Sequence, residues 1–129
     1  MYSGLPAAEP VSDWTIYMKS SQISVNPGAS SIFVFLDMRP DSVDAGNFGL
    51  CMDGYPSNPA GYRFWDLPGM QHAKACSFSF ADGHAEAKKW RDPSTTPDFV
   101  PSPGSVTDKF TSPNNVDIAW LQERATRHK

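Results

Sequence analysis

Charged residues are scarce in this chain of 129 residues, since Asp, Glu, Lys and Arg together make up 19% of it. The formal net charge is −3 and no basic stripe with interleaved aromatic residues occurs, which argues against nonspecific nucleic-acid binding. Long apolar runs are also lacking, and the first twenty residues contain no charged segment followed by an apolar one. We therefore expect neither a membrane span nor a signal peptide in the chain as given.

Cysteine is nearly absent, occurring only as Cys51 and Cys76. Cys76 falls on the apolar side of an alternating stretch, where a buried free thiol is the expectation. A disulfide between the two cysteines is the alternative if the domain is exported.

Proline and glycine, in contrast, are plentiful, with twelve and nine residues. This composition predicts many turns and irregular loops and few long helices. The length fits one domain with a modest core, which we place at residues 1–129. Within it we expect an irregular lead-in at residues 1–12, a proline-rich segment at 91–113 that wraps the domain or acts as a spacer, and a short capped helix within 114–127.

Residues 75–90 predict a β-hairpin. Large and small residues alternate along its first half, as in a strand with one buried face, and Asp82-Gly83 is typical of a two-residue type I′ turn. Such a turn pairs Phe78 with Ala87 and gives two different faces. The expected apolar face holds Cys76, Phe78, Phe80, Ala85 and Ala87. The expected polar face holds Ser77, Ser79, His84, Glu86 and Lys88.

The other expected elements are shorter. Residues 30–37 contain five consecutive apolar residues and predict a central strand buried on both faces. Residues 47–52 predict a second strand, and residues 14–18 fit either a strand or a short helix. The fold class expected is therefore α+β, with a small antiparallel sheet, a hairpin in the C-terminal half, irregular loops and a short C-terminal helix.

Four segments carry a family resemblance. They are, in chain order, FVFLDMRPDSVDAGNF, FWDLPGMQH, His72 followed after nine residues by Asp82-Gly83, and DIAWLQERATR. In this order they resemble prepilin-type, pseudopilin-like proteins with a C-terminal H-x9-DG signature, relatives of the major pseudopilin of type II secretion. Two positions depart from the family pattern, because Met38 stands where an acid is usual and Ala45 where aspartate is common.

The resemblance implies a structural function: the globular head of a filament or secretion-apparatus subunit, periplasmic or extracellular in the full-length family. Its partners would be like subunits in a homo-oligomer, and exported cargo or polysaccharide. Family members begin with a charged leader and a long apolar helix, which this chain lacks. We expect either a truncated head or a gene fragment, with the sheet face that packs on that helix exposed or dimerised.

Two alternative sets of metal ligands can be predicted from the sequence. His72, Asp82 and His84 offer imidazole and carboxylate ligands suited to zinc, although each also has an ordinary role in a turn or on a strand surface. The resemblance implies calcium instead, and hard oxygen ligands would come from the acids of the loops, Asp37, Asp41, Asp44 and Asp66.

The alternative function, from another class, is a small secreted carbohydrate-active hydrolase or sugar-binding module. The catalytic candidates for a glycosidase are Asp37, Asp41, Asp82 and Glu86, with Asp66 as a further acid. Tyr62, Trp65 and Trp90 would stack on sugar rings. No G-x-S-x-G or H-E-x-x-H motif is present, so a serine or zinc hydrolase has no sequence support.

Overall fold

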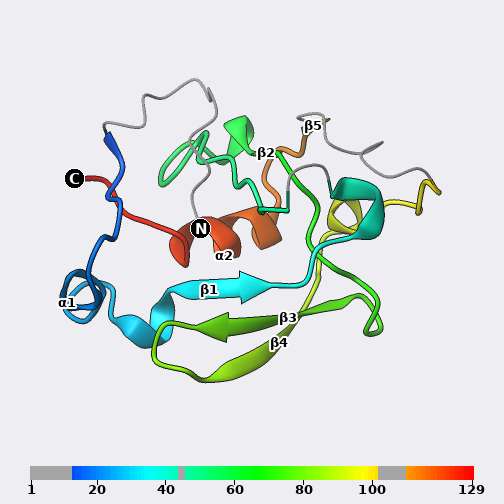
Figure 1. Ribbon diagram of the computed structural model, residues 1–129. Helices are drawn as coiled ribbons and strands as arrows, with labels where there is room; N and C mark the ends of the chain where they lie inside the picture. Colours follow the sequence, from blue (N-terminus) through cyan, green and yellow to red (C-terminus); the bar gives the residue numbers. More distant parts are fainter. Residues whose placement is uncertain (1–12, 44–45, 102–109) are drawn as a thin grey trace.

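The computed structural model of the chain describes residues 13–43, 46–101 and 110–129 (Figure 1). A three-stranded antiparallel sheet has the order β1-β3-β4, and a short strand pair joins β2 to β5. The strands are β1 (Phe33–Leu36), β2 (Arg63–Phe64), β3 (Ala75–Phe80), β4 (Ala85–Lys89) and β5 (Phe110–Thr111), and the α-helices are α1 (Ser20–Ile23) and α2 (Val116–Glu123). The predicted α+β class, with a small antiparallel sheet and a short C-terminal helix, is confirmed.

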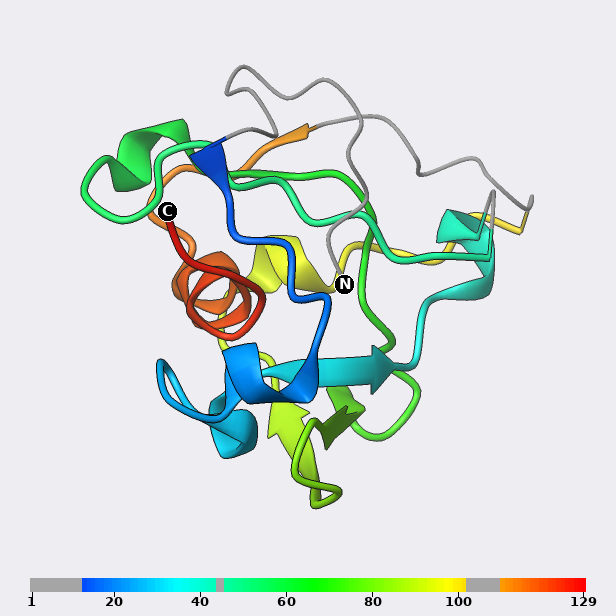
Figure 2. The ribbon, with the colours of Figure 1, turned by 60° about the vertical axis from the view of Figure 1, so that its left-hand side comes forward.

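The sheet lies at one side of the molecule, and α2 and the long loops lie at the other (Figures 1 and 2). Between them α2 buries Ile118 and Leu121 completely, and Trp120 meets Phe78 edge-on with ring centroids 5.0 Å apart. Burying each such side chain contributes on the order of 1.5–3 kcal/mol. The core further includes Trp14, Phe33, Phe48, Leu50, Met52, Tyr62, Phe64, Leu67, Phe80 and Trp90.

The hairpin forms at the predicted residues, but its predicted register is wrong by one residue. Phe78 faces Glu86 rather than Ala87, because the loop has three residues instead of two. A type I′ turn needs positive φ at both turn positions, and here only Gly83 has it, at 93°. The Asp82 carboxylate instead accepts the His84 amide at 3.1 Å, which favours the longer loop.

This shift exchanges the two faces of β4. Glu86 and Lys88 share the face of Phe78 and Cys76, whereas Ala85 and Ala87 lie beside the serines of β3 on the outer face. Along β3 itself the prediction is confirmed, since Cys76, Phe78 and Phe80 are all buried.

Three further predictions for the first half of the chain are wrong. β1 is an edge strand, and Phe35 on it is 67% exposed, so it is not buried on both faces. Residues 47–52 are largely buried but pair with no other strand in the described parts of the chain. Residues 14–18 form neither strand nor helix, because Trp14 makes only an isolated bridge to His128 and Met18 is 78% exposed.

The C-terminal helix begins as its sequence predicts. Asn115 is the N-cap, and its side-chain oxygen accepts the amides of Asp117 at 2.8 Å and Ile118 at 3.2 Å. Such a cap contributes roughly 0.5–2 kcal/mol. Among the described residues no helix is long and apolar enough to cross a membrane.

Candidate functional site

The H-x9-DG residues lie in the two turns that bound β3. Before the strand, the His72 carbonyl accepts the amide of Ala75 at 3.0 Å and closes a turn. After it, Asp82 and Gly83 form the hairpin loop, where the Gly83 amide donates to the Phe80 carbonyl at 2.9 Å. The spacing of the signature therefore matches the length of one strand plus its two turns.

His72 lies apart from Asp82 and His84. The Nδ1 atom of His84 is 2.5 Å from Asp82 Oδ1, and this hydrogen bond lowers the pKa of Asp82. The His84 ring also stacks on Phe80, with centroids 4.4 Å apart. His72 is exposed at the other end of β3, which spans about 20 Å. The described ranges hold no group of three or more His, Cys, Asp or Glu side chains suited to a metal ion, so these residues do not fit one.

In the loop after β1, the Asp41 carboxylate is engaged by Arg39. The guanidinium binds it through two hydrogen bonds, of 2.8 Å and 2.5 Å, and both side chains are almost fully buried. Burial alone would raise the pKa of Asp41, but the hydrogen bonds from Arg39 and from the Val100 amide outweigh it and lower that pKa. Asp41 is therefore not available as a catalytic acid or a calcium ligand.

Arg39 also holds residues 97–100 of the proline-rich segment against the loop after β1. Its guanidinium donates to the carbonyls of Pro97 at 2.6 Å and Asp98 at 3.1 Å. The amide of Val100 donates in turn to Asp41 at 2.9 Å. One buried ion pair thus fixes residues 97–100 beside the loop that leaves β1.

The remaining acidic candidates are not brought together with Asp41. Asp37, Asp82 and Glu86 are exposed, and they lie after β1, in the hairpin loop and on β4. Asp66 is buried and accepts the Gly49 amide at 2.5 Å, while Asp44 lies outside the described residues.

The aromatic residues expected to stack on sugars are mostly core residues. Tyr62 and Trp90 are each 6% exposed, and the indole of Trp90 donates to the Gly69 carbonyl at 2.8 Å. Trp65 is half-buried. The prediction of a surface aromatic platform is therefore wrong for two of its three members.

Sequence reasoning missed a further buried carboxylate, Asp117, at the start of α2. It accepts hydrogen bonds from the amides of Arg91 and Asp92 at 2.9 Å each, from Thr95 at 2.9 Å and from the Lys88 ammonium at 3.1 Å. Burial would raise its pKa, but these donors together lower it. Asp117 thereby ties together the end of β4, the turn at residues 93–95 and α2.

The sequence indicates only weakly that the carboxylates of Asp117 and Asp41 are buried and hydrogen-bonded. An aspartate in the first turn of a helix is common because of the helix dipole, so Asp117 looked ordinary. Arg39 and Asp41 flank a proline, and nothing in that spacing shows that the pair is buried.

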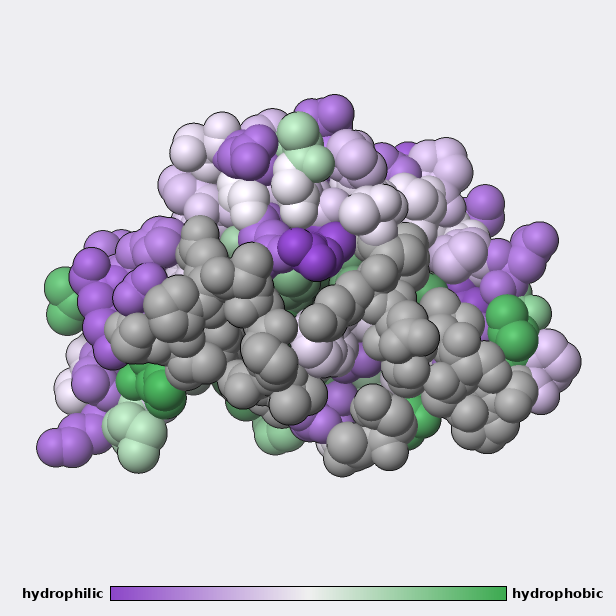
Figure 3. Space-filling model, turned by 90° about the horizontal axis from the view of Figure 1, so that it is seen from above, coloured by the Kyte–Doolittle hydropathy of each residue, from purple (hydrophilic) through white to green (hydrophobic). Residues whose placement is uncertain are grey.

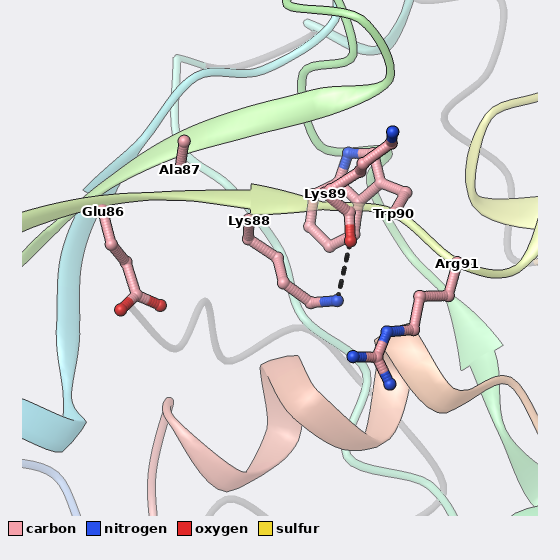
Figure 4. Close-up of a pocket in the computed structure, with 6 residues that line it drawn as sticks. All are labelled: Glu86, Ala87, Lys88, Lys89, Trp90 and Arg91. Carbon is pink, nitrogen blue, oxygen red and sulfur yellow. Dashed lines mark hydrogen bonds between the residues drawn. The ribbon is translucent and has the colours of Figure 1, made fainter.

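An open depression of about 490 Å³ runs along β4 (Figure 4). Its walls come from residues 86–91, and Lys88 lies over the rings of Trp90 and Trp120 at 5.6 Å and 5.5 Å. Figure 3 shows the face of the molecule opposite to β4, where the described residues are mostly polar and the apolar areas are small and separate. The depression has one acidic side chain, Glu86, so it lacks the carboxylate pair that a glycosidase needs.

Both cysteines are free and buried, which excludes the disulfide alternative. Burial raises the pKa of Cys51 to about 11 and that of Cys76 to about 12. These thiols are protonated at neutral pH and are poor nucleophiles.

No protein family, curated protein or solved structure matches the chain.

Proposed function

We propose that this domain is a structural subunit, the globular head of a pseudopilin-like protein that contacts like subunits in a filament or secretion apparatus. The observation that carries the proposal is the role of the signature residues. The His72 carbonyl and the Asp82-Gly83 loop close the turns on either side of β3, and the Asp82 carboxylate accepts the His84 amide within its own loop, which supports a role of these segments in the fold. A signature of this kind is expected where a scaffold has to be maintained.

Contacts among the segments of the resemblance give further support. Met38 and Pro68 form a bridge, and the Gly69 amide donates to the Asp37 carbonyl at 2.7 Å. These contacts join the segment after β1 to the FWDLPGMQH segment, while Trp120 of the C-terminal segment packs on Phe78 of the hairpin. The four segments therefore act as one packing unit around the sheet.

The hydrolase alternative has less support. Asp41 is held by Arg39, the exposed acids lie on separate elements, and two of the three aromatic residues are in the core. Because a glycosidase needs two carboxyl groups about 5–10 Å apart across a substrate cleft, none of these positions favours that chemistry.

The genomic sequence upstream of the codon for Met1 tests the proposal. A pseudopilin subunit predicts an in-frame leader with a basic start, followed by an apolar helix of about 20 residues. An in-frame catalytic domain in that place would contradict the proposal.

A further inference from the structure

β4 is an open edge of the sheet. At one end of the hairpin the Phe80 amide donates to the His84 carbonyl at 2.9 Å, and at the other the Trp90 amide donates to the Lys74 carbonyl at 2.9 Å. Every second residue between these pairs therefore turns its amide and carbonyl away from β3. These residues are Ala85, Ala87 and Lys89. No described strand pairs with that side, and β4 lies at the margin of the ribbon in both views (Figures 1 and 2).

Charge alternates along this edge. Glu86 and Lys88 both extend toward α2, while Ala87 between them points to the opposite side (Figure 4). Glu86 is exposed and has no ion-pair partner among the described residues. Lys88 donates to the Lys89 carbonyl at 2.9 Å and to Asp117 at 3.1 Å, which leaves its third ammonium hydrogen for another acceptor.

We propose that β4 pairs antiparallel with β4 of a second copy of this chain, about a two-fold axis at Ala87. This pairing places Glu86 opposite the partner's Lys88, and Lys88 opposite the partner's Glu86. The two alanines at the axis leave the strands free to approach. The result is one continuous six-stranded sheet, and the inference rests on the proposed function only in taking a like subunit as the partner.

The charges select this register over the others. An axis at Glu86 would set that carboxylate against its own copy, and an axis at Lys88 or Lys89 would do the same with two ammonium groups. An axis at Ala85 would face Glu86 with the partner's His84 and shorten the pairing. Edge lysines commonly protect a strand from random pairing, and here the axis at Ala87 gives the longest symmetric pairing that sets no like charges directly opposite each other.

Sedimentation equilibrium over a range of concentrations tests the dimer. The wild type is expected to form a reversible dimer of twice the 14.2 kDa chain mass. Glu86→Lys turns both attractive pairs into repulsive ones, so we expect the dissociation constant to rise about tenfold or more. Glu123→Lys makes the same charge change on α2, where the side chain is 62% exposed, and we expect a change of no more than about twofold.

Cysteine substitution tests the register. Under mild oxidation Ala87→Cys is expected to form a disulfide with its own copy, whereas Ala85→Cys alone is expected to stay monomeric on a denaturing gel. The buried native thiols do not compete, because their pKa values are raised. A wild type that stays monomeric at every concentration would overturn the interface. So would unchanged dimerisation of Glu86→Lys, or faster cross-linking of Ala85→Cys, in variants with native circular dichroism.

These outcomes are separate from those of the proposed function. If the chain is monomeric and its gene encodes a leader and an apolar helix, the proposed β4 interface is contradicted and the subunit proposal is supported. A dimeric chain that turns over a glycoside would retain the interface and contradict the subunit proposal.

Discussion

At the scale of single residues, Asp117 shows how this domain uses its acids. The side chain is fully buried, yet it is the ionised carboxylate that the surrounding donors stabilise. Two backbone amides, a hydroxyl and an ammonium group donate to it from the end of β4 and from the turn at residues 93–95 and the residues before it. A buried charge with this many donors stabilises the fold, whereas one without them would cost several kcal/mol.

We expect Asp117→Asn to lower the free energy of unfolding by about 2–5 kcal/mol, because an amide nitrogen would face donors that now face an oxygen. Urea unfolding followed by tryptophan fluorescence measures the loss. Asp37→Asn, a substitution of the same kind at an exposed position, is the control and should cost little.

The same site predicts a pH dependence. The pKa of Asp117 is lower in the folded protein, so its ionised form adds stability at pH values above the unfolded pKa of about 4, and this stability is lost as the pH falls through the lower folded value. The wild type should therefore lose stability on acidification below about pH 4 more steeply than Asp117→Asn. Parallel slopes for the two proteins would show that Asp117 does not titrate as its hydrogen bonds imply.

Arg39 is the second residue on which a whole segment depends. Lysine in its place cannot bind Asp41 through two hydrogen bonds and reach the carbonyls of Pro97 and Asp98 as well. We expect Arg39→Lys to lower the unfolding free energy by about 2 kcal/mol or more. Thermolysin should then cleave faster beside Phe99, which is 52% exposed, as mass spectrometry of the fragments can show. Arg91→Lys, at an exposed arginine, should leave the cleavage rate unchanged.

At the scale of elements, the hairpin is the part on which the core is built. Phe80 is 4% exposed and stands in the core beside Phe33 and Phe78. We expect Phe80→Ala to cost about 3–5 kcal/mol in urea unfolding. Gly83→Ala should cost less, about 1–2 kcal/mol, because its φ of 93° is strained for alanine while no atom lies within 4 Å of the added methyl group. A smaller loss for Phe80→Ala than for Gly83→Ala would contradict this view of the core.

The elements differ in how far their sequences determine them. The alternation along β3 predicts its buried face correctly, because that pattern is local and does not depend on the loop that follows. The faces of β4 depend on the loop length, and one additional loop residue exchanges them. Residues 32–36 are uniformly apolar, so their sequence does not tell an edge strand from a central one. The exposure of Phe35 follows from the position of β1 at the edge of the sheet, which depends on the whole fold. The cap at Asn115 was predictable because capping is again local.

At the scale of the whole molecule, the candidate site also combines features that the local sequence predicts with features that depend on distant parts of the chain. Sequence reasoning could single out Asp37, Asp41, Asp82 and Glu86 as acids in loops and on a strand. It could not show that Asp41 is enclosed by Arg39, since that pairing depends on how residues 97–100 return to the domain. The spacing of His72 and Asp82-Gly83 was visible, but its relation to the length of β3 needed the structure.

We infer that none of the four acids singled out from the sequence serves turnover, and that Asp41 serves the fold through its buried ion pair with Arg39. The most direct measurement is a panel of four variants, Asp37→Asn, Asp41→Asn, Asp82→Asn and Glu86→Gln, assayed for both urea unfolding and hydrolysis of chromogenic glycosides and esters at about pH 5–8.

We expect Asp41→Asn to lose about 3–5 kcal/mol of stability because it breaks a buried ion pair. The other three should unfold like the wild type, and all five proteins should hydrolyse the substrates at the background rate. A reproducible wild-type rate that disappears in one exposed variant, with its unfolding curve unchanged, would contradict the account.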